Sequence, residues 1–590
     1  MPDRLGAMLL MVLGLLGCGF ALKRFAKLAV EWIPAILGSI IILWVSGGGI
    51  LGYLQESVTV FNILGVLLLV SCLFQDLKAK KTIQWHASIK LVLYAAVCLA
   101  LAFYLKDTVL THYDNFSHWG TIVKSLYLEN SLPDNESYLI TFQSYPPGSA
   151  AFIYYILQAV GWSEANALTA QALLLIAYAL GLLAHISKEQ RYVWAGAWVC
   201  FCIYLCFNFI TVRDLLVDAL LAASGLAASV YIVAFRRQRS SGGWAAVMMT
   251  ACYLIKNSGL FFVVINTILL LSIYLRNNES ENKGKQFWRC LPSVLLPWIA
   301  CIVWTMHTKH SFDYAQESIH AMSFENYAAV LGDKSWQDIL QISKAYWGKY
   351  AQVKSPEISM LLMWNLLSVA FVIGCRCIVG KAPAGRHMRF ILLMDGALLF
   401  YAVGLWGMYL LSMPTNEAVT VNGFARYLCC FLIWMNGMSL WYVLHTMESM
   451  PHNHQRIVAV LACVCLLALC LGYTFQREAL TSYDPQKVNR YDKIVANMEN
   501  YDPEMYTMLY PANGFDWFCM RYKLWDSDLE WRSDLDAEYA EDTLGCYDYL
   551  IVLDQTEETE VILAPYIGTT NHVGGYRISW EDELVLEPDT

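Results

Sequence analysis

The feature that most limits what this chain can fold into is a series of apolar runs of about 17–22 residues, the length at which a helix crosses a hydrocarbon core of roughly 30 Å. The 590 residues are 57% hydrophobic and only 15% charged, whereas soluble domains carry about 25% charged residues. The runs therefore predict an α-helical polytopic membrane protein with about 13–14 transmembrane helices, of which 14 is the better fit.

The apolar windows are Leu5–Leu22, Leu28–Val45, Val60–Phe74, Ile89–Leu105, Ala165–Ile186, Val193–Ile210, Leu215–Phe235, Trp244–Leu275, Phe287–Met306, Ile358–Val379, Phe390–Leu411, Leu428–Leu444 and Ile457–Phe475. The window Trp244–Leu275 is too long for one span and is interrupted at Lys256-Asn257-Ser258-Gly259. We therefore expect two short helices that meet at a polar break.

The orientation follows from basic residues, which gather in cytoplasmic loops. With 14 spans all the basic clusters share the cytoplasmic side; they are Lys23/Arg24/Lys27, Lys78/Lys80/Lys81, Lys188/Arg191, Arg236/Arg237/Arg239, Lys283/Lys285, Lys381/Arg386/Arg389 and Arg456. The loops 106–148, 308–357 and 412–426 and the tail from about residue 476 are then extracytoplasmic.

The tail has the composition of a soluble domain. It is acidic, with a helical pattern at Pro485–Met498 and β-type runs at Met505–Leu509 and Tyr549–Leu553. We expect residues 1–475 to form the transmembrane domain and residues 476–590 a small extracytoplasmic α/β domain. Cys519 and Cys546 lie in this tail, where they either form a disulfide or remain free thiols.

The first outer loop is rich in groups that can carry chemistry. Asp114 lies between His112 and His118, a helical pattern follows over residues 114–129, and a Tyr145-Pro146-Pro147-Gly148 turn ends the loop. A carboxylate at such a junction can accept a proton from a hydroxyl, or it can simply cap the helix. The histidines are candidate substrate contacts or merely solvated side chains, and they lack zinc-site spacing.

Charged residues also interrupt or border the apolar runs. Asp214 and Asp218 are four apart, as on one helical face, and ionisable groups inside a membrane usually line a polar cavity. Arg213 can instead pair with an aspartate to stabilise the turn. Lys256 is a candidate phosphate contact or a snorkelling side chain.

Arg426 and Tyr427 open a span and are a candidate anion clamp or an interfacial anchor. Gly-rich phosphate loops, GxSxG, HExxH and CxxC motifs are absent from the sequence, so no nucleotide site is expected.

The order of these features resembles the GT-C superfamily of integral-membrane glycosyltransferases, and most closely its branch of protein O-mannosyltransferases and aminoarabinose transferases. The resemblance covers roughly Ile89 to Phe475 and rests on short motifs: the acidic outer loop, YPPG, R…D…LLA, KNSGL and RYL. Two features depart from the family pattern. Three apolar runs precede the usual first span, and the loop reads HYDNFSHW, without the adjacent acidic pair of many relatives.

The resemblance implies an inverting transfer of a sugar from a polyprenyl-phosphate carrier to an acceptor hydroxyl on a cell-envelope glycan, lipid or protein. It implies that Asp114 is the catalytic base, that Asp218 or Asp214 is a second acid, and that the active site is on the outer face of the plasma (inner) membrane. The candidate substrate contacts are His112, His118, Arg213, Lys256, Arg426, Tyr427 and Tyr145. A divalent metal cofactor is left open, and no nucleic-acid partner is expected.

Three other classes of protein remain open at this stage. They are a polysaccharide polymerase or ligase of the same fold, a transporter or lipid flippase, and a membrane protein with a structural or assembly role. An enzyme should gather Asp114, Asp218, Lys256 and Arg426 at one outward cavity, whereas a transporter should hold its charges near the bilayer midplane.

Overall fold

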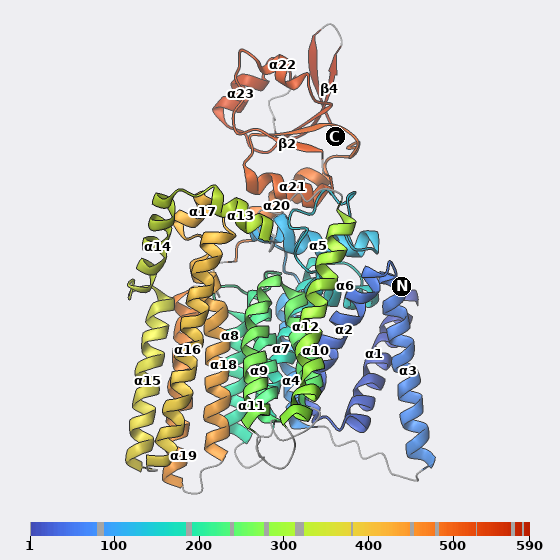
Figure 1. Ribbon diagram of the computed structural model, residues 1–590. Helices are drawn as coiled ribbons and strands as arrows, with labels where there is room; N and C mark the ends of the chain where they lie inside the picture. The colour runs from blue at the N-terminus through green and yellow to red at the C-terminus, as the bar shows by residue number, and fades with distance from the viewer. Residues whose placement is uncertain are drawn as a thin grey trace. The chain divides into compact units, whose positions relative to one another are not determined.

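The computed structural model describes residues 2–78, 88–184, 191–235, 241–276, 283–312, 324–378, 381–448, 453–477, 483–526, 528–567, 573–580 and 583–589 (Figure 1). The chain divides into two compact units. The first contains residues 1–107, 126–132 and 142–482, and the second contains residues 108–125, 133–141 and 483–590. The domain boundary near residue 475 stays a prediction.

The first unit is a bundle of apolar helices. Within the described residues, nine helices are long and apolar enough to cross a membrane; they are α1 (Pro2–Phe25), α2 (Ile33–Ile50), α3 (Leu54–Lys78), α7 (Glu164–Leu180), α12 (Lys283–Ser311), α15 (Pro356–Ile378), α16 (Lys381–Leu411), α18 (Phe424–Glu448) and α19 (Asn453–Gln476). Six shorter apolar helices accompany them: α4 (Ile89–Leu105), α6 (Gly148–Val160), α8 (Arg191–Cys206), α9 (Asp218–Ala234), α10 (Ser241–Ile255) and α11 (Leu260–Arg276).

The predicted helical polytopic fold is therefore confirmed, although nine helices rather than 13 or 14 reach full spanning length among the residues that the structure describes. The difference arises because five of the predicted spans, from α4 to α11, contain only 15–17 helical residues. Helix α6 was not among the predicted spans, because its 13 residues include Ser149 and Gln158 and fall short of a span. The basic residues Lys80, Lys81, Lys188, Arg236, Arg237 and Arg239 lie outside the described residues, and the orientation stays a prediction.

The expected break in the long apolar window is confirmed. Helix α10 ends at Ile255, Lys256 is extended (φ −162°, ψ 141°), and a short 3-10 turn, η5 (Asn257–Gly259), leads into α11. The two helices pack against each other. The break therefore places a lysine backbone outside any helix, at the junction of two packed helices.

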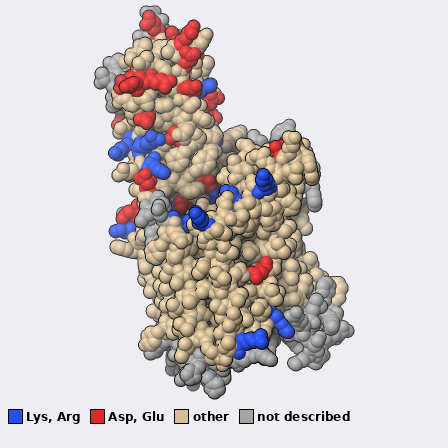
Figure 2. All heavy atoms as spheres, turned by 90° about the vertical axis from the view of Figure 1, so that its left-hand side faces the viewer, with Lys and Arg blue, Asp and Glu red and all other residues tan. Residues whose placement is uncertain are grey.

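Two of the long helices form the centre of the bundle. The most apolar stretches of α7 and α18 are 83% and 89% buried, whereas those of α1, α12 and α16 are 22% buried. Helix α9 packs against both central helices and is buried from Asp218 to Ile232. On the face drawn in Figure 2, charged side chains are sparse over the bundle. The bundle thus exposes mostly apolar side chains and buries its central helices.

The three long loops also contain helices, as the pattern over residues 114–129 predicted for the first of them. The first loop forms a π-helical turn, η2 (Asn115–Trp119), and α5 (Gly120–Glu129). In the loop 308–357, of which residues 313–323 lie outside the described residues, α13 (Phe324–Gly332) and α14 (Trp336–Tyr350) form. The loop 412–426 holds α17 (Thr415–Thr420).

The C-terminal part of the second unit is built on a mixed five-stranded sheet in the order β2-β1-β3-β4-β5. Its strands are β1 (Thr507–Tyr510), β2 (Leu529–Trp531), β3 (Tyr549–Val552), β4 (Gly574–Trp580) and β5 (Leu584–Pro588). Strand β1 pairs in parallel with β2 and β3, while β4 is antiparallel to β3 and β5. The helices are α20 (Gln486–Ala496), α21 (Gly514–Leu524), α22 (Ala540–Leu544) and α23 (Glu557–Leu563).

The predicted sheet is confirmed in β1 and β3, and the predicted helix near Pro485 is α20. The disulfide alternative is not realised, because Cys519 and Cys546 are both free thiols, one buried and one exposed.

Close packing between α1 and α3 depends on small residues. A Cβ atom on Gly17 would overlap the Gly65 carbonyl, and one on Gly65 would overlap the Gly14 carbonyl. Small residues let membrane helices approach closely enough for backbone contact. An ion pair between Arg24 and Asp76 at 2.6 Å joins the same two helices near one end.

We expect Gly17→Val to lower the free energy of unfolding by about 1–3 kcal/mol, because the added methyl groups force α1 away from α3. The matched control is Gly6→Val on the same helix, where an added Cβ meets nothing within 4 Å. Thermal unfolding of the purified protein in detergent measures both. Equal midpoints for the two variants would contradict the glycine contact.

Candidate functional site

The first unit contains a buried cluster of charges around Asp218. Asp218 is the first residue of α9 and is 5% exposed. The Lys256 ammonium lies 3.7 Å from its Oδ1, and Arg426 Nε lies 3.9 Å from its Oδ2. The three side chains come from α9, from the break after α10, and from the first turn of α18. The enzyme hypothesis expects four charged residues at one cavity. Three of them therefore lie together, because Lys256 and Arg426 are each within 4 Å of Asp218.

The two cations neighbour Asp218 at distances longer than a hydrogen bond. A charge-assisted N–H···O bond spans about 2.7–2.9 Å, whereas these two separations approach 4 Å. The Asp218 Oδ2 atom is buried and has no hydrogen-bond partner among the described residues. At these separations the two cations act on the carboxylate mainly through their charge.

Helix N-termini add positive potential to the cluster. Helix α9 begins at Asp218, the turn η5 that leads into α11 follows Lys256 directly, and α18 begins two residues before Arg426. The first N–H groups of a helix lack intrahelical partners and carry partial positive charge. Backbone donors and side-chain cations thus come from the same three helix starts, which is an arrangement that suits an anion.

Two tyrosines border the cations. The Lys256 ammonium lies 5.7 Å from the ring centroid of Tyr145 and 5.9 Å from that of Tyr427. Arg426 lies 5.1 Å from the Tyr427 ring and donates a hydrogen bond to its hydroxyl at 3.3 Å. Burial raises the pKa of the Tyr145 phenol, and the Lys256 charge only partly offsets this. Tyr145 therefore keeps its proton and can act as a hydrogen-bond donor.

One glycine, Gly148, lets the Tyr145 turn lie against the end of α10, and another, Gly259, lets η5 fold back on the same helix. A Cβ atom on Gly148 would come within 2.5 Å of the Leu254 carbonyl oxygen, and one on Gly259 would overlap the Cys252 carbonyl. The Tyr145-Pro146-Pro147-Gly148 turn ends the loop at the start of α6, as predicted. Trp304 of α12 donates to the Ser144 carbonyl at 3.0 Å and fixes the other side of the turn.

The segment before Asp218 corrects one expectation. Asp214 and Asp218 do not share a helical face, because α9 begins only at Asp218 and Asp214 lies in the preceding loop. There Asp214 Oδ2 accepts a hydrogen bond from Thr211 Oγ1 at 3.2 Å. The Arg213 guanidinium lies 4.8 Å from the centre of the Tyr104 ring. Among these residues, Asp218 is the one that lies with Lys256 and Arg426.

Three candidate residues of the loop 106–148, His112, Asp114 and His118, belong to the second unit, whereas Tyr145 belongs to the first. Asp114 precedes η2 without a capping hydrogen bond from its side chain, so capping does not account for the carboxylate. Its side chain is 27% exposed and lies 4.0 Å from His112 Nδ1, which accepts a hydrogen bond from the Asp114 amide. His118 is 3% exposed and packs on Trp119, so it is not the surface histidine that the sequence suggested.

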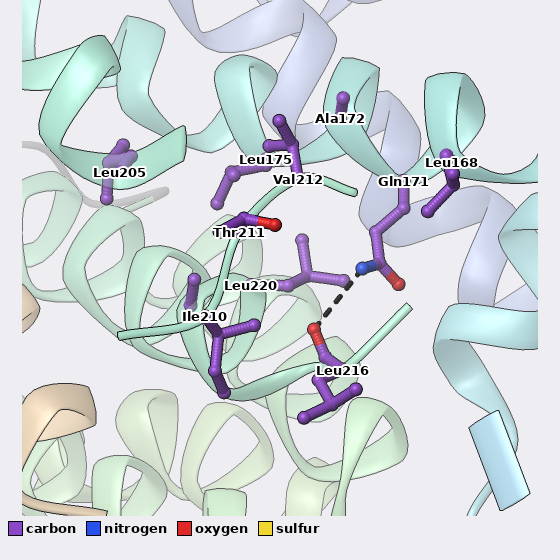
Figure 3. A pocket seen from close by; sticks show the side chains of 11 residues that line it. Leu168, Gln171, Ala172, Leu175, Leu205, Ile210, Thr211, Val212, Leu216 and Leu220 are labelled. Atoms are coloured by element: carbon purple, nitrogen blue, oxygen red, sulfur yellow. Dashed lines mark hydrogen bonds between the residues drawn. The ribbon is translucent and has the colours of Figure 1, made fainter. Parts of the chain in front are cut away.

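One polar residue near the site, Gln171, was not predicted from the sequence. Gln171 of α7 donates a hydrogen bond to the backbone carbonyl of Leu216 (Figure 3) and another to that of Asp214, which lie two and four residues before Asp218. Its only sequence signal is a single glutamine within an apolar helix. It also lines a small cavity, together with Leu168, Ala172, Leu175, Leu205, Ile210, Thr211, Val212, Leu216, Ala219 and Leu220.

Within the described part of the chain, no group of three or more His, Cys, Asp or Glu side chains is arranged to hold a metal ion. The Asp218 carboxylate instead has two cations, Lys256 and Arg426, within 4 Å.

Comparison with known proteins gives a similarity at the level of solved structures. The chain is similar to the crystal structure of ArnT from Cupriavidus metallidurans bound to undecaprenyl phosphate, with a TM-score of 0.40 and 14% sequence identity over 85% of this chain and 98% of that chain. It is also similar to ArnT from Cupriavidus metallidurans in the apo state, with a TM-score of 0.41, 13% identity and the same coverage. No family model and no curated protein sequence matches the chain.

We expect Asp218→Asn to destabilise the protein by about 3 kcal/mol, because it removes a buried carboxylate that two cations share. Adding Lys256→Met to Asp218→Asn should recover part of this loss, since the double variant buries one charge fewer. A double-mutant cycle on the thermal unfolding of the full chain measures the coupling. Strict additivity of the two single changes would show that the two side chains do not interact.

Proposed function

We propose that the chain is an inverting glycosyltransferase that moves a sugar from a polyprenyl-phosphate carrier to an acceptor hydroxyl at the outer face of the plasma membrane. The observation that carries the proposal is the buried cluster of Asp218, Lys256 and Arg426. The acceptor is a cell-envelope glycan, a lipid or a protein, and the C-terminal domain is extracytoplasmic.

The charges of the cluster suit a phosphate that carries a lipid. Lys256 and Arg426 contribute two positive charges and Asp218 one negative charge, so these three side chains have a net charge of +1. Arg426 is the most exposed of them, with 19% of its side chain accessible, against 8% for Lys256 and 7% for Asp218. A phosphate that approaches from the Arg426 side would then meet the guanidinium first. An arginine offers several donors in a planar fork, which fits phosphate oxygens.

The reaction needs little chemistry from the protein beyond placing and neutralising charge. The acceptor oxygen forms a bond to the anomeric carbon while the bond from that carbon to the phosphate oxygen breaks, and the bonding electron pair leaves with the phosphate. Lys256 and Arg426 stabilise the negative charge that develops on the departing phosphate. Tyr145 and Tyr427 border the cations that would hold this phosphate.

The acceptor hydroxyl loses its proton to a carboxylate, and Asp114 is the proposed base. Its carboxylate is partly exposed and has no capping role, as a group that must meet an acceptor requires. Asp218, and then Asp214, are the alternative bases within the first unit. His112, His118 and Arg213 are proposed substrate contacts.

A transporter or lipid flippase is the second candidate. The break at Lys256 between α10 and α11 favours it, because discontinuous helices in transporters often bind substrate at the break. The enzyme is preferred because a transporter has no use for a base such as Asp114. A polymerase or ligase would use the same phosphate contacts with an oligosaccharide donor.

We expect Asp114→Asn and Lys256→Met each to lower sugar transfer by about 100-fold or more, since one removes the base and the other a charge on the leaving group. The assay uses membranes that contain the full chain, extracted polyprenyl-phosphate sugars as donors, and release of free carrier phosphate as the readout.

The matched control is Lys90→Met, which removes another buried lysine that pairs with a carboxylate, Glu31 at 2.8 Å. Lys90 lies at the start of α4, and its loss should leave the rate per folded molecule unchanged. Unchanged transfer in Asp114→Asn would move the base to Asp218 or Asp214. Movement of lipid or sugar across vesicles without any release of carrier phosphate would favour the transporter.

A further inference from the structure

The position of the Asp218 carboxylate depends on the loop that precedes it. The loop 207–217 joins α8 to α9 and contains a single bridge between Phe207 and Thr211. At its start Asn208 donates to the carbonyls of Tyr204 and Leu205 and accepts from the Ile210 amide. These contacts fix the beginning of the loop, and its end needs other support.

Gln171 supplies a contact at that end. Its Nε2 donates to the carbonyl of Asp214 at 3.2 Å and to that of Leu216 at 3.3 Å. Figure 3 shows the amide nitrogen pointing toward the Leu216 carbonyl, from the helix on the opposite side of the loop. One side chain of the central helix α7 therefore holds two backbone positions just before Asp218.

The packing beside the loop is incomplete at one place. A cavity lies beside the loop against Thr211, Val212 and Leu216, with Gln171 in its wall. It offers about 10 Å³ to the centre of a water molecule, which is close to the minimum volume that one water requires. Leu215, Leu216 and Val217 are buried, and the Gln171 amide adds a directional constraint to this apolar packing beside a space that side chains leave open.

A buried glutamine at position 171 lowers the stability of the fold when its packing alone is considered. Gln171 is 8% exposed, and its Oε1 is buried without a hydrogen-bond partner among the described residues. A buried acceptor without a partner destabilises the fold, and a leucine of similar size would avoid that cost. The two hydrogen bonds that the amide donates are thus what distinguishes glutamine from leucine at this position.

We infer that Gln171 is a positioning residue of the charge cluster: by holding the carbonyls of Asp214 and Leu216, it fixes the Asp218 carboxylate and, through it, Lys256 and Arg426. The inference rests on the proposed function, in which these cations hold the phosphate of a lipid carrier. Gln171 acts through Asp218 and does not itself contact the phosphate.

The test is the affinity of the purified full chain in nanodiscs for undecaprenyl phosphate. We expect Gln171→Leu to weaken binding by about tenfold, as the loss of two buried hydrogen bonds next to the site implies. The matched control is Gln158→Leu in α6, which removes a glutamine that donates to Asn130 at 3.2 Å, away from this loop. The control variant should bind as the wild type does.

Loss of a positioning residue lowers the affinity for the phosphate, whereas loss of a purely structural residue lowers the unfolding temperature. We expect Gln171→Leu to unfold at about the same temperature as the Gln158→Leu control while its affinity falls. A second variant, Gln171→Glu, retains one donor only when its carboxyl is protonated, so its affinity relative to the wild type should recover as the pH falls. This recovery would not occur if position 171 mattered only for packing.

Each outcome decides the case. If the wild type binds and Lys256→Met does not, while Gln171→Leu and Gln171→Glu both bind as the wild type does, the inference on Gln171 is wrong and the proposed function stands. If the wild type itself does not bind undecaprenyl phosphate, or Lys256→Met binds equally well, the phosphate site is wrong, and the role of Gln171 is overturned with it.

Discussion

A carboxylate shared by two cations in the interior of a helical bundle is the interaction on which the rest of the site depends. At an effective dielectric constant of 20, each attraction at the observed separation is worth about 4 kcal/mol before the cost of dehydration. Without Asp218, Lys256 and Arg426 would repel each other in a buried place. The carboxylate therefore allows two positive charges to stay close together, and it leaves them with positive charge to offer to a ligand.

The backbone around the cluster brings three distant parts of the chain together. Gly148 and Gly259 allow main-chain contact where any side chain would intrude. On another side, Tyr401 and Tyr409 donate to the carbonyls of Tyr427 and Asn422, which holds the start of α18. The charges are thus held by main-chain contacts and hydrogen bonds, which are more directional than apolar packing.

The sequence predicted the parts of this protein that follow from hydrophobicity and from the charged residues and prolines that interrupt or end helices. The apolar windows, the break at Lys256 and the turn before Gly148 were all visible in it, because length, charge and proline determine them locally. Strand β4 was missed because its sequence, GGYRISW, lacks an apolar run and is stabilised by pairing with β3 and β5. The role of Gln171 was hidden because it depends on carbonyls about 45 residues away, and periodicity says nothing about such contacts.

Helix α6 has a consequence for how the protein is made. At a rise of 1.5 Å per residue, its 13 residues extend about 20 Å, roughly two-thirds of the hydrocarbon thickness. Such a segment is a poor candidate for independent insertion by the translocation machinery. Yet it is buried along most of its length against α2 and α7. Its docking would therefore follow the insertion of those neighbours, so that the turn carrying Tyr145 reaches the charge cluster late in biogenesis.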